Sequence, residues 1–215
     1  MNEFVISSGH CLKVQGASDI INEVNEARKV VNKVYEYLKE LNCTVYKFHD
    51  DTSTTQSKNL STIVNYHNSK KRDLDISVHF NAASRTNNPR GVEVLYVSDN
   101  SKQIAEKVVN AIAKASGLKN RGIKYRDNLY FLNKTNKPAI LIEVCFVDSK
   151  ADVNVYHNKF NEICKAIAET LSGKKLSETK VTVAKPKEET KVKQQPKSVA
   201  KPKYPNKLYK VTSPL

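Results

Sequence analysis

The clearest pattern in the chain is a strict alternation of polar and apolar residues over positions 75–82, D-I-S-V-H-F-N-A. A period of two predicts a β-strand whose two faces differ chemically. The polar face carries His79 just before the strand runs out into a polar segment. Side chains at the carboxyl ends of strands form the ligand sites of α/β sheets, so His79 is a candidate functional residue.

The remaining pattern alternates between short apolar runs and longer stretches of helical spacing. Strand-like runs cover 3–8, 43–48, 91–97 and 138–146, with an edge strand over 120–124 and a short packed turn over 129–132. Apolar residues recur at three and four over 19–41, 60–67, 98–117 and 152–171, which predicts helices. This alternation predicts an α/β fold, with a single twisted, mostly parallel sheet of about six strands and helices on both faces.

The periodicity stops after Gly173, where Lys, Pro, Glu, Gln and Thr dominate. Such a composition buries no core and predicts a flexible C-terminal tail. We therefore expect a folded domain over 1–173, a Lys/Pro-rich linker over 174–203, and the start of a further module over 204–215. The net charge of +14 is concentrated in the tail, which has twelve lysines and three glutamates from Lys174 onward.

Composition narrows the class of protein. The four cysteines are widely spaced and predict reduced, packed thiols, with Cys11 and Cys145 as structural residues. Cys145 lies two residues after Glu143 in a predicted strand, so the two are expected on the same face of it. No run approaches the ~20 apolar residues of a membrane span, so no membrane insertion is expected. Residues 1–3 lack the basic start of a signal peptide, so we expect synthesis in the cytoplasm without a signal peptide.

Four further side chains fall at strand ends, helix starts or buried strands. His10 follows the first strand, and Glu23 and Glu26 lie one turn apart at the start of the first long helix. Glu143 interrupts an otherwise apolar strand, where a lone carboxylate is unfavourable unless it is paired or bound to a cation. Two imidazoles and one carboxylate are the ligand set of many hydrolytic zinc sites.

The other candidates have ordinary explanations. His49, His67 and His157 have no strand-end partner and are interpreted as surface residues. Asn81 follows His79 and is either a turn-forming residue or a hydrogen-bonding partner of substrate.

Several short blocks also resemble a known family, the zinc-dependent N-acetylmuramoyl-L-alanine amidases of the amidase-3 type, and among them catalytic domains of phage endolysins. The resemblance covers about residues 1–173. Its blocks are G-H at 9–10, G-A at 16–17, N-E at 22–23, S-V-H-F-N-A at 77–82, G-V-E-V at 91–94, R-G at 121–122, P-A-I-L-I-E at 138–143, and Phe146. The first block often reads G-H-G-G in the family, whereas Cys11 and Leu12 follow His10 here.

The resemblance implies a role for each matching residue. His10, Glu23 and His79 would bind Zn²⁺, Glu143 would be catalytic, and Asn81 would contact substrate. Glu26 replaces Glu23 as a ligand only if the helix begins a turn later, and the resemblance favours Glu23.

The implied function is hydrolysis of the amide bond between N-acetylmuramic acid and L-alanine in peptidoglycan, by zinc-activated water with a glutamate general base. The alternatives are a zinc peptidase or deacetylase acting on another cell-wall amide, and a non-catalytic basic wall-binding protein. The enzyme would act at the bacterial cell wall after release, in phage lysis or in wall turnover. Residues 204–215 would begin a cell-wall-binding module. The tail has no arginine and few aromatic residues, so anionic wall polymers fit it better than nucleic acid.

Overall fold

The computed structural model describes residues 1–177, in which strands alternate with helices except that two strands follow each other directly over 74–96 and two helices over 150–172. The strands are β1 (Glu3–Ser8), β2 (Thr44–Phe48), β3 (Leu74–Asn81), β4 (Val92–Tyr96), β5 (Asn120–Tyr125) and β6 (Ala139–Phe146). The helices are α1 (Glu23–Glu40), α2 (Gln56–Asn68), α3 (Asp99–Ser116), α4 (Tyr130–Lys134), α5 (Lys150–Asn158) and α6 (Phe160–Ser172).

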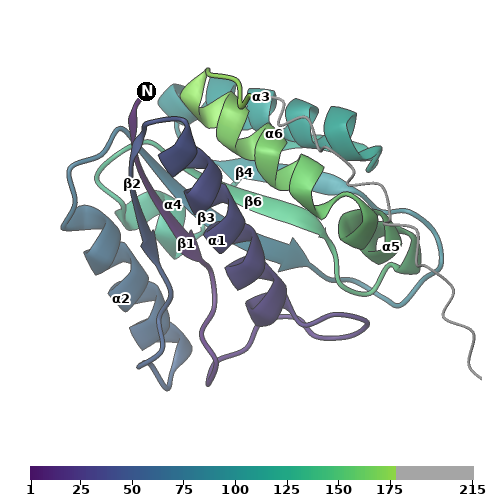
Figure 1. Cartoon of the computed structure of the whole chain (residues 1–215). Helices are drawn as coiled ribbons and strands as arrows, with labels where there is room; N and C mark the ends of the chain where they lie inside the picture. The colour runs from purple at the N-terminus through teal and green to yellow at the C-terminus, as the bar shows by residue number, and fades with distance from the viewer. Residues whose placement is uncertain (178–215) are drawn as a thin grey trace, which may run out of the picture. The chain divides into compact units, whose positions relative to one another are not determined.

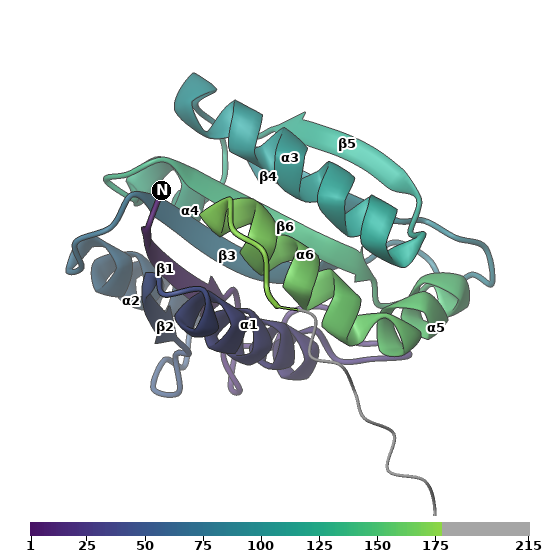
Figure 2. The same ribbon diagram turned by 45° about the horizontal axis from the view of Figure 1, so that its top comes forward.

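These strands form one sheet in the order β2-β1-β3-β6-β4-β5 (Figures 1 and 2). All neighbouring pairs are parallel except β4 and β6, which are antiparallel. The predicted mostly parallel α/β sheet is therefore confirmed, including the edge strand β5. Because β1 and β3 are parallel neighbours, their carboxyl ends meet at one edge of the sheet.

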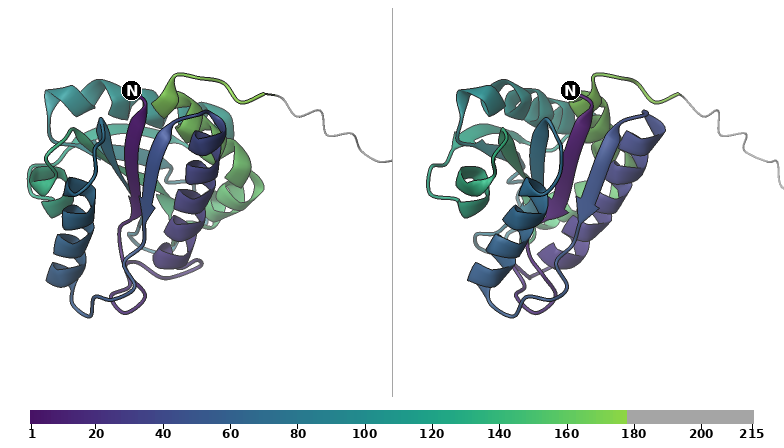
Figure 3. Two further views of the ribbon diagram at one scale, coloured as in Figure 1. Left: turned by 60° about the vertical axis from the view of Figure 1, so that its left-hand side comes forward. Right: turned by 90° about the vertical axis from the view of Figure 1, so that its left-hand side faces the viewer.

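Helices cover both faces of the sheet, and each face has its own apolar cluster. Figure 3 shows α1 and α2 on opposite sides of the strands. The larger cluster joins α1, α3, α5 and α6 to the sheet, and a smaller one joins α2 and α4 to Leu95 and Leu141. The polar side of β3, which carries Asp75, Ser77, His79 and Asn81, is therefore the α2/α4 side, since the apolar residues of β3 lie in the larger cluster.

Three predicted helices differ from the observed ones, and the first of them is α2, which begins at Gln56 rather than at residue 60 because the Thr55 side chain accepts a hydrogen bond from the Lys58 amide. Residues 19–22 are not helical, because the Asn22 side chain accepts a hydrogen bond from the Asn25 amide and fixes the helix start at Glu23. The single helix predicted over 152–171 is two helices, which are divided at Lys159 (φ −119°, ψ 18°). Asn158, a weak helix former, ends the first of them.

Ordered structure continues just past the predicted domain boundary. Leu176 is buried in the larger cluster, and the Lys174 ammonium donates to the Leu41 carbonyl. Within the described residues no helix is long and apolar enough to cross a membrane. The predicted linker beyond residue 177 and the predicted module over 204–215 lie outside the described residues.

Candidate metal centre and active site

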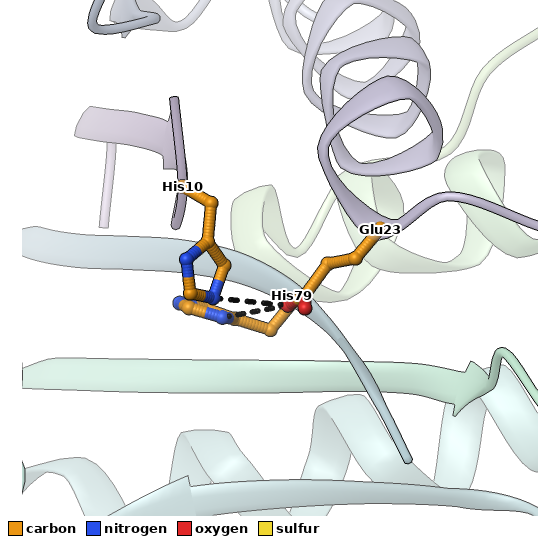
Figure 4. Close-up of side chains that lie close together, drawn as sticks. All are labelled: His10, Glu23 and His79. Carbon is orange, nitrogen blue, oxygen red and sulfur yellow. Dashed lines mark hydrogen bonds and ion pairs between the residues drawn. The ribbon is translucent and has the colours of Figure 1, made fainter. Parts of the chain in front are cut away.

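Three of the predicted site residues converge at the carboxyl edge of the sheet. His10 lies on the loop after β1, His79 is near the end of β3, and Glu23 is the first residue of α1. Figure 4 shows both imidazole rings approaching the Glu23 carboxylate. We call these residues the His-Glu-His cluster. They are brought together because β1 and β3 pair in parallel up to Ser8 and Val78.

The separations within the cluster suit a shared cation. Glu23 Oε1 lies 3.0 Å from His79 Nδ1 and 3.5 Å from His10 Nε2. One ligand-type atom from each residue lies within 4.8 Å of the others. A tetrahedral ion with bonds of about 2.0–2.1 Å separates its ligand atoms by roughly 3.4 Å, close to the first two distances.

Backbone groups hold the Glu23 carboxylate in this position. The Phe80 amide donates to Oε1 at 3.1 Å, and the Ala17 amide donates to Oε2 at 2.7 Å. The side chain of Glu23 is only 4% exposed, whereas those of His10 and His79 are 23% and 15% exposed. The carboxylate is thus fixed before any ligand binds, and the two rings border solvent.

Two glycines allow this close approach. A Cβ atom added at Gly9 would overlap the imidazole of His79. A Cβ added at Gly16 would overlap the Glu23 carboxylate and crowd His10. The glycines of the G-H and G-A blocks therefore leave room for the cluster, a role that the sequence does not reveal.

The charges of the cluster are coupled. Burial opposes protonation of His79, but its hydrogen bond to Glu23 and the charges of Glu23 and Glu143 outweigh burial and raise its pKa. Burial together with the nearby His79 lowers the pKa of His10. Burial of Glu23 is outweighed by its bond to His79 and by both imidazoles, so its pKa is lowered. Glu23 is therefore the anionic member of the cluster.

Glu143 stands beside His79 on the neighbouring strand, as the register of β3 and β6 pairs these two residues. Its Oε2 atom is buried and has no hydrogen-bond partner among the described residues. Burial, opposed by His79 and aided by Glu23 and Glu93, raises its pKa to about 7. A carboxyl group whose pKa is near 7 can both accept and return a proton at neutral pH.

A third carboxylate, which the sequence pattern did not single out, continues this row. Glu93 on β4 pairs in register with Glu143. Its Oε2 accepts from the Arg121 guanidinium at 2.7 Å, and its Oε1 accepts from the Asn81 amide at 2.9 Å. The Arg121 guanidinium also lies 4.9 Å from the Phe146 ring centroid. The sequence gives no local sign of this contact, and the register of β4 against β6 reveals it.

A pocket of about 520 Å³ lies on the α2/α4 side of the sheet. Of the residues described above, it is lined by His10, His79, Asn81, Glu93 and Glu143. Its other walls come from α2 and from the segment between β5 and α4. A volume of several hundred Å³ is typical of sites that bind small molecules or short segments of a polymer.

Two of the remaining histidines are not surface residues, contrary to the sequence-based interpretation. His67 is 0% exposed: its Nδ1 lies 2.8 Å from Asp75 Oδ1 and its Nε2 lies 3.0 Å from Ser7 Oγ. Arg72 bonds both oxygens of Asp75 at 2.8 Å. We call Ser7, His67, Arg72 and Asp75 the buried network. Its partners are up to 60 residues apart in sequence, so His67 looked unpartnered.

His49 is half-buried between Ser8 and Asn32, with ring nitrogens 3.0 and 3.2 Å from their side-chain oxygens. Burial, aided by the charges of Arg28 and Lys47, lowers its pKa to about 4. His157 is exposed, as predicted.

Glu26 lies outside the cluster, because its carboxylate bonds the Tyr156 hydroxyl at 2.9 Å and the Lys29 ammonium at 2.8 Å. The structural interpretation of the cysteines is confirmed for Cys11 and Cys145, which are fully buried. The expectation that Cys145 shares a face with Glu143 is wrong. A register shift between β3 and β6 places Cys145 in the larger apolar cluster with Val144.

The donor set fits a small borderline cation. Two imidazole nitrogens and one carboxylate are the protein ligands of catalytic zinc sites, which leave a coordination position open. Both rings border the pocket, and the unpartnered Oε2 of Glu143 is close by. The residues therefore fit a metal ion with a reacting group beside it.

Comparison with known proteins agrees with this geometry. The sequence pattern of the N-acetylmuramoyl-L-alanine amidase family matches residues 4–173. An uncharacterised 38.4 kDa protein of Clostridium perfringens is 32% identical over 182 residues, which cover 79% of this chain and 53% of that protein. The probable cell wall amidase LytH of Staphylococcus saprophyticus is 29% identical over 171 residues, covering 78% and 56%. The chain thus spans about half the length of the curated relatives it matches.

Two solved structures are similar along most of their length. The catalytic domain of the CD27L endolysin, which targets Clostridium difficile, superposes with a TM-score of 0.75 and 25% identity, covering 82% of this chain and 100% of that one. The catalytic domain of CwlV, an amidase from Bacillus (Paenibacillus) polymyxa var. colistinus, gives a TM-score of 0.68 and 27% identity, covering 80% and 97%. The match over residues 4–173 shows that the chain belongs to the N-acetylmuramoyl-L-alanine amidase family.

Proposed function

We propose that the protein is a zinc-dependent amidase of peptidoglycan, which hydrolyses the amide bond between the lactyl group of N-acetylmuramic acid and L-alanine of the stem peptide. The observation that carries the proposal is the row His79–Glu143, in which a member of the His-Glu-His cluster adjoins a carboxyl group with an unpartnered buried oxygen. Family membership supports the choice of substrate.

Three residues would hold the metal ion, and each supports binding differently. His10 and His79 would supply neutral nitrogen ligands, and Glu23 would supply the negative charge that favours a dication. When bound, zinc lowers the pKa of water toward about 7 and stabilises negative charge on a carbonyl oxygen. The backbone amides of Ala17 and Phe80 keep Glu23 from rotating away.

Glu143 would act as the general base. Its carboxylate takes a proton from the water that attacks the lactyl carbonyl carbon, and it then delivers that proton to the departing L-alanine nitrogen. The pKa of about 7 suits both steps, because the carboxylate is a strong enough base to accept the proton and the carboxylic acid is a strong enough acid to release it.

Asn81 has a supporting role in this proposal. Its amide nitrogen holds Glu93, and its carbonyl oxygen accepts from the Ala82 amide at 2.8 Å. An amide oxygen has two lone pairs, so one remains for a substrate donor in the pocket. We propose that Asn81 is both a turn residue and a substrate contact.

The Lys-rich tail has a separate proposed role. Twelve lysines and three glutamates from residue 174 onward give it a charge of +9. Such a segment is attracted to anionic polymers of the bacterial wall and would raise the local concentration of the enzyme there.

The experiment that tests the function is digestion of purified peptidoglycan with the zinc-loaded protein, followed by mass spectrometry. New lactyl carboxyl groups together with new L-alanine amino termini support the amidase. Release of acetate, or of amino termini elsewhere in the peptide, would instead indicate a deacetylase or a peptidase. Wall clearing that persists in chelator would indicate a non-catalytic protein.

The matched variant is Glu143→Gln, with bound zinc measured by elemental analysis. We expect full zinc content and a rate lower by about 10²–10⁴-fold, the usual contribution of a general acid–base group. Loss of zinc from this variant would make Glu143 a ligand and refute its role as the base.

A further inference from the structure

The proposed reaction uses only part of the pocket. Besides the residues near the His-Glu-His cluster, the pocket is lined by Arg126, Asn128 and Tyr130, which come from the segment after β5 and the start of α4. Arg126 is the only lysine or arginine among the described residues that line this pocket. This part of the pocket has no role in breaking the amide bond.

Arg126 differs from every other arginine of the chain. The sequence has six arginines, and five of them form an ion pair in the described structure. The five pairs are Arg28–Asp51, Arg72–Asp75, Arg85–Asp19, Arg90–Asp148 and Arg121–Glu93. The guanidinium of Arg126 has only a 3.2 Å hydrogen bond to the neighbouring Tyr125 carbonyl. Most of its five donors therefore remain available within the described structure.

The backbone of Arg126 is nevertheless fixed. Its amide donates to the Tyr96 carbonyl at 2.8 Å, which continues the ladder between β4 and β5. Tyr130 lines the same pocket and is 41% exposed, one of the five exposed large apolar residues of the described chain. A fixed, exposed arginine in a pocket that also presents an exposed aromatic residue is a typical site for an anionic group on an extended ligand.

The position of Arg126 sets the distance of that anionic group from the scissile bond. Tyr96 lies three residues beyond Glu93 on β4, and Glu93 pairs with Glu143. Three residues of a strand span roughly 10 Å, and the step from β6 across β4 to β5 adds about 10 Å at right angles, so the backbones of Glu143 and Arg126 are about 14 Å apart. An extended peptide covers that distance with about four residues, and the long Arg126 side chain shortens the span to about three.

We propose that Arg126 forms a carboxylate-binding subsite for the stem peptide, about three residues from the bond that is cut. This inference rests on the proposed function and specifies its substrate class: stem peptides with free carboxylates rather than amidated ones. The guanidinium fork matches a carboxylate with two parallel hydrogen bonds, which a neutral amide cannot reproduce.

The test compares two substrates and three proteins. The substrates are N-acetylmuramoyl-pentapeptide with free carboxylates and the same compound fully amidated. For the wild-type protein we expect kcat/KM to be about tenfold higher for the acidic substrate, the low end for a charged hydrogen bond at an exposed site. For Arg126→Gln we expect the preference to disappear, because kcat/KM for the acidic substrate should fall to the value for the amidated one. Lys107→Gln, an exposed cation on α3 outside the pocket, should keep the wild-type preference.

A preference that survives in Arg126→Gln, or is absent in the wild-type protein, would overturn the subsite. If neither substrate is cut, the proposed function fails, and binding then decides the subsite separately. Isothermal titration calorimetry of both compounds with the Glu143→Gln protein should show tighter binding of the acidic one, and this difference should vanish when Arg126→Gln is added. Equal binding of both compounds would refute the subsite.

Discussion

The His-Glu-His cluster and the buried network lie on the same two strands but differ in how their polar atoms are satisfied. Asp75 and His79 are four residues apart on the polar side of β3. Each group also includes a residue on or just after β1, which is Ser7 in the buried network and His10 in the cluster. In the buried network His67, Asp75 and Ser7 are fully enclosed and hydrogen-bonded. In the cluster both rings border the pocket, and Glu143 beside them has an unpartnered oxygen.

This difference shows that residue type alone does not identify a site. Ser7, His67 and Asp75 have the order of contacts of a hydrolytic triad, with a serine hydroxyl on one ring nitrogen and a carboxylate on the other. No substrate reaches them, because all three side chains are fully buried. The Asp75 carboxylate is also ion-paired with Arg72. We therefore propose a stabilising role for the buried network and keep the His-Glu-His cluster as the proposed metal site.

The largest expected effect on activity comes from His79→Ala. It removes one proposed ligand, and we expect loss of bound zinc and a fall in amidase rate of about 10³-fold or more, the scale of losing the metal's charge stabilisation. Because the Glu23 carboxylate keeps its two backbone donors, Ala17 and Phe80, the free energy of unfolding should fall less than in Asp75→Ala. Zinc content, wall digestion and urea denaturation together check this. A folded variant that keeps its zinc would exclude His79 as a ligand.

The opposite pattern is expected for Asp75→Ala. Removing the carboxylate leaves Arg72 and His67 buried without their partner, so we expect a loss of about 3–5 kcal/mol in the free energy of unfolding. The remaining folded fraction should bind zinc with normal stoichiometry. Urea denaturation measures the first effect, and Asp127→Ala, at an exposed carboxylate, is the control. Full stability of Asp75→Ala would remove the distinction between the two groups.

The members of the His-Glu-His cluster could be predicted from the sequence, whereas the contacts of the buried network could not. His10, His79 and Glu143 mark strand ends or break apolar runs, so local pattern exposes them, and parallel pairing then brings them together. His67 bonds Ser7 across 60 residues and gives no such local signal.

Glu93 and Arg126 were also missed, for a different reason. Alternating or terminal charges in a strand usually face solvent, and only the register of β4 against β6 and β5 places these two at the pocket. The shift that moves Cys145 off the Glu143 face arises from pairing between β3 and β6, which no single segment encodes.

A smaller effect tests how tightly the cluster is packed. A Cβ atom at Gly9 overlaps the His79 ring, so Gly9→Ala should displace this ring and lower zinc affinity by about 10–100-fold, the range for residues that orient ligands. Competition with a chromogenic chelator measures the affinity. Gly173→Ala, at a left-handed position (φ 70°) after α6, should lower stability but leave zinc affinity unchanged. Equal affinities in both variants would contradict the packing argument.

The smallest effect concerns the pH dependence of the buried network. Burial, together with the charge of Arg72, outweighs Asp75 and lowers the pKa of His67 below its ordinary value of 6.5. In the unfolded chain His67 therefore binds a proton near pH 6.5, whereas in the folded protein it stays neutral to a lower pH. The free energy of unfolding consequently falls as the pH drops from 8 to 5. One proton contributes at most about 1.4 kcal/mol per pH unit.

His67→Gln should reduce this slope, because glutamine keeps hydrogen-bonding capacity but does not titrate. The slope should not vanish, since His49, whose pKa is lowered to about 4, contributes in the same direction. Urea denaturation at pH 8, 6.5 and 5 measures both proteins. His157→Gln, at an exposed position, should keep the wild-type slope. An unchanged slope in His67→Gln would mean that His67 has the same pKa in the folded and the unfolded chain. A steeper slope in the variant would mean that Asp75 outweighs burial and raises the pKa of His67 in the folded protein. Either result would refute the lowered pKa.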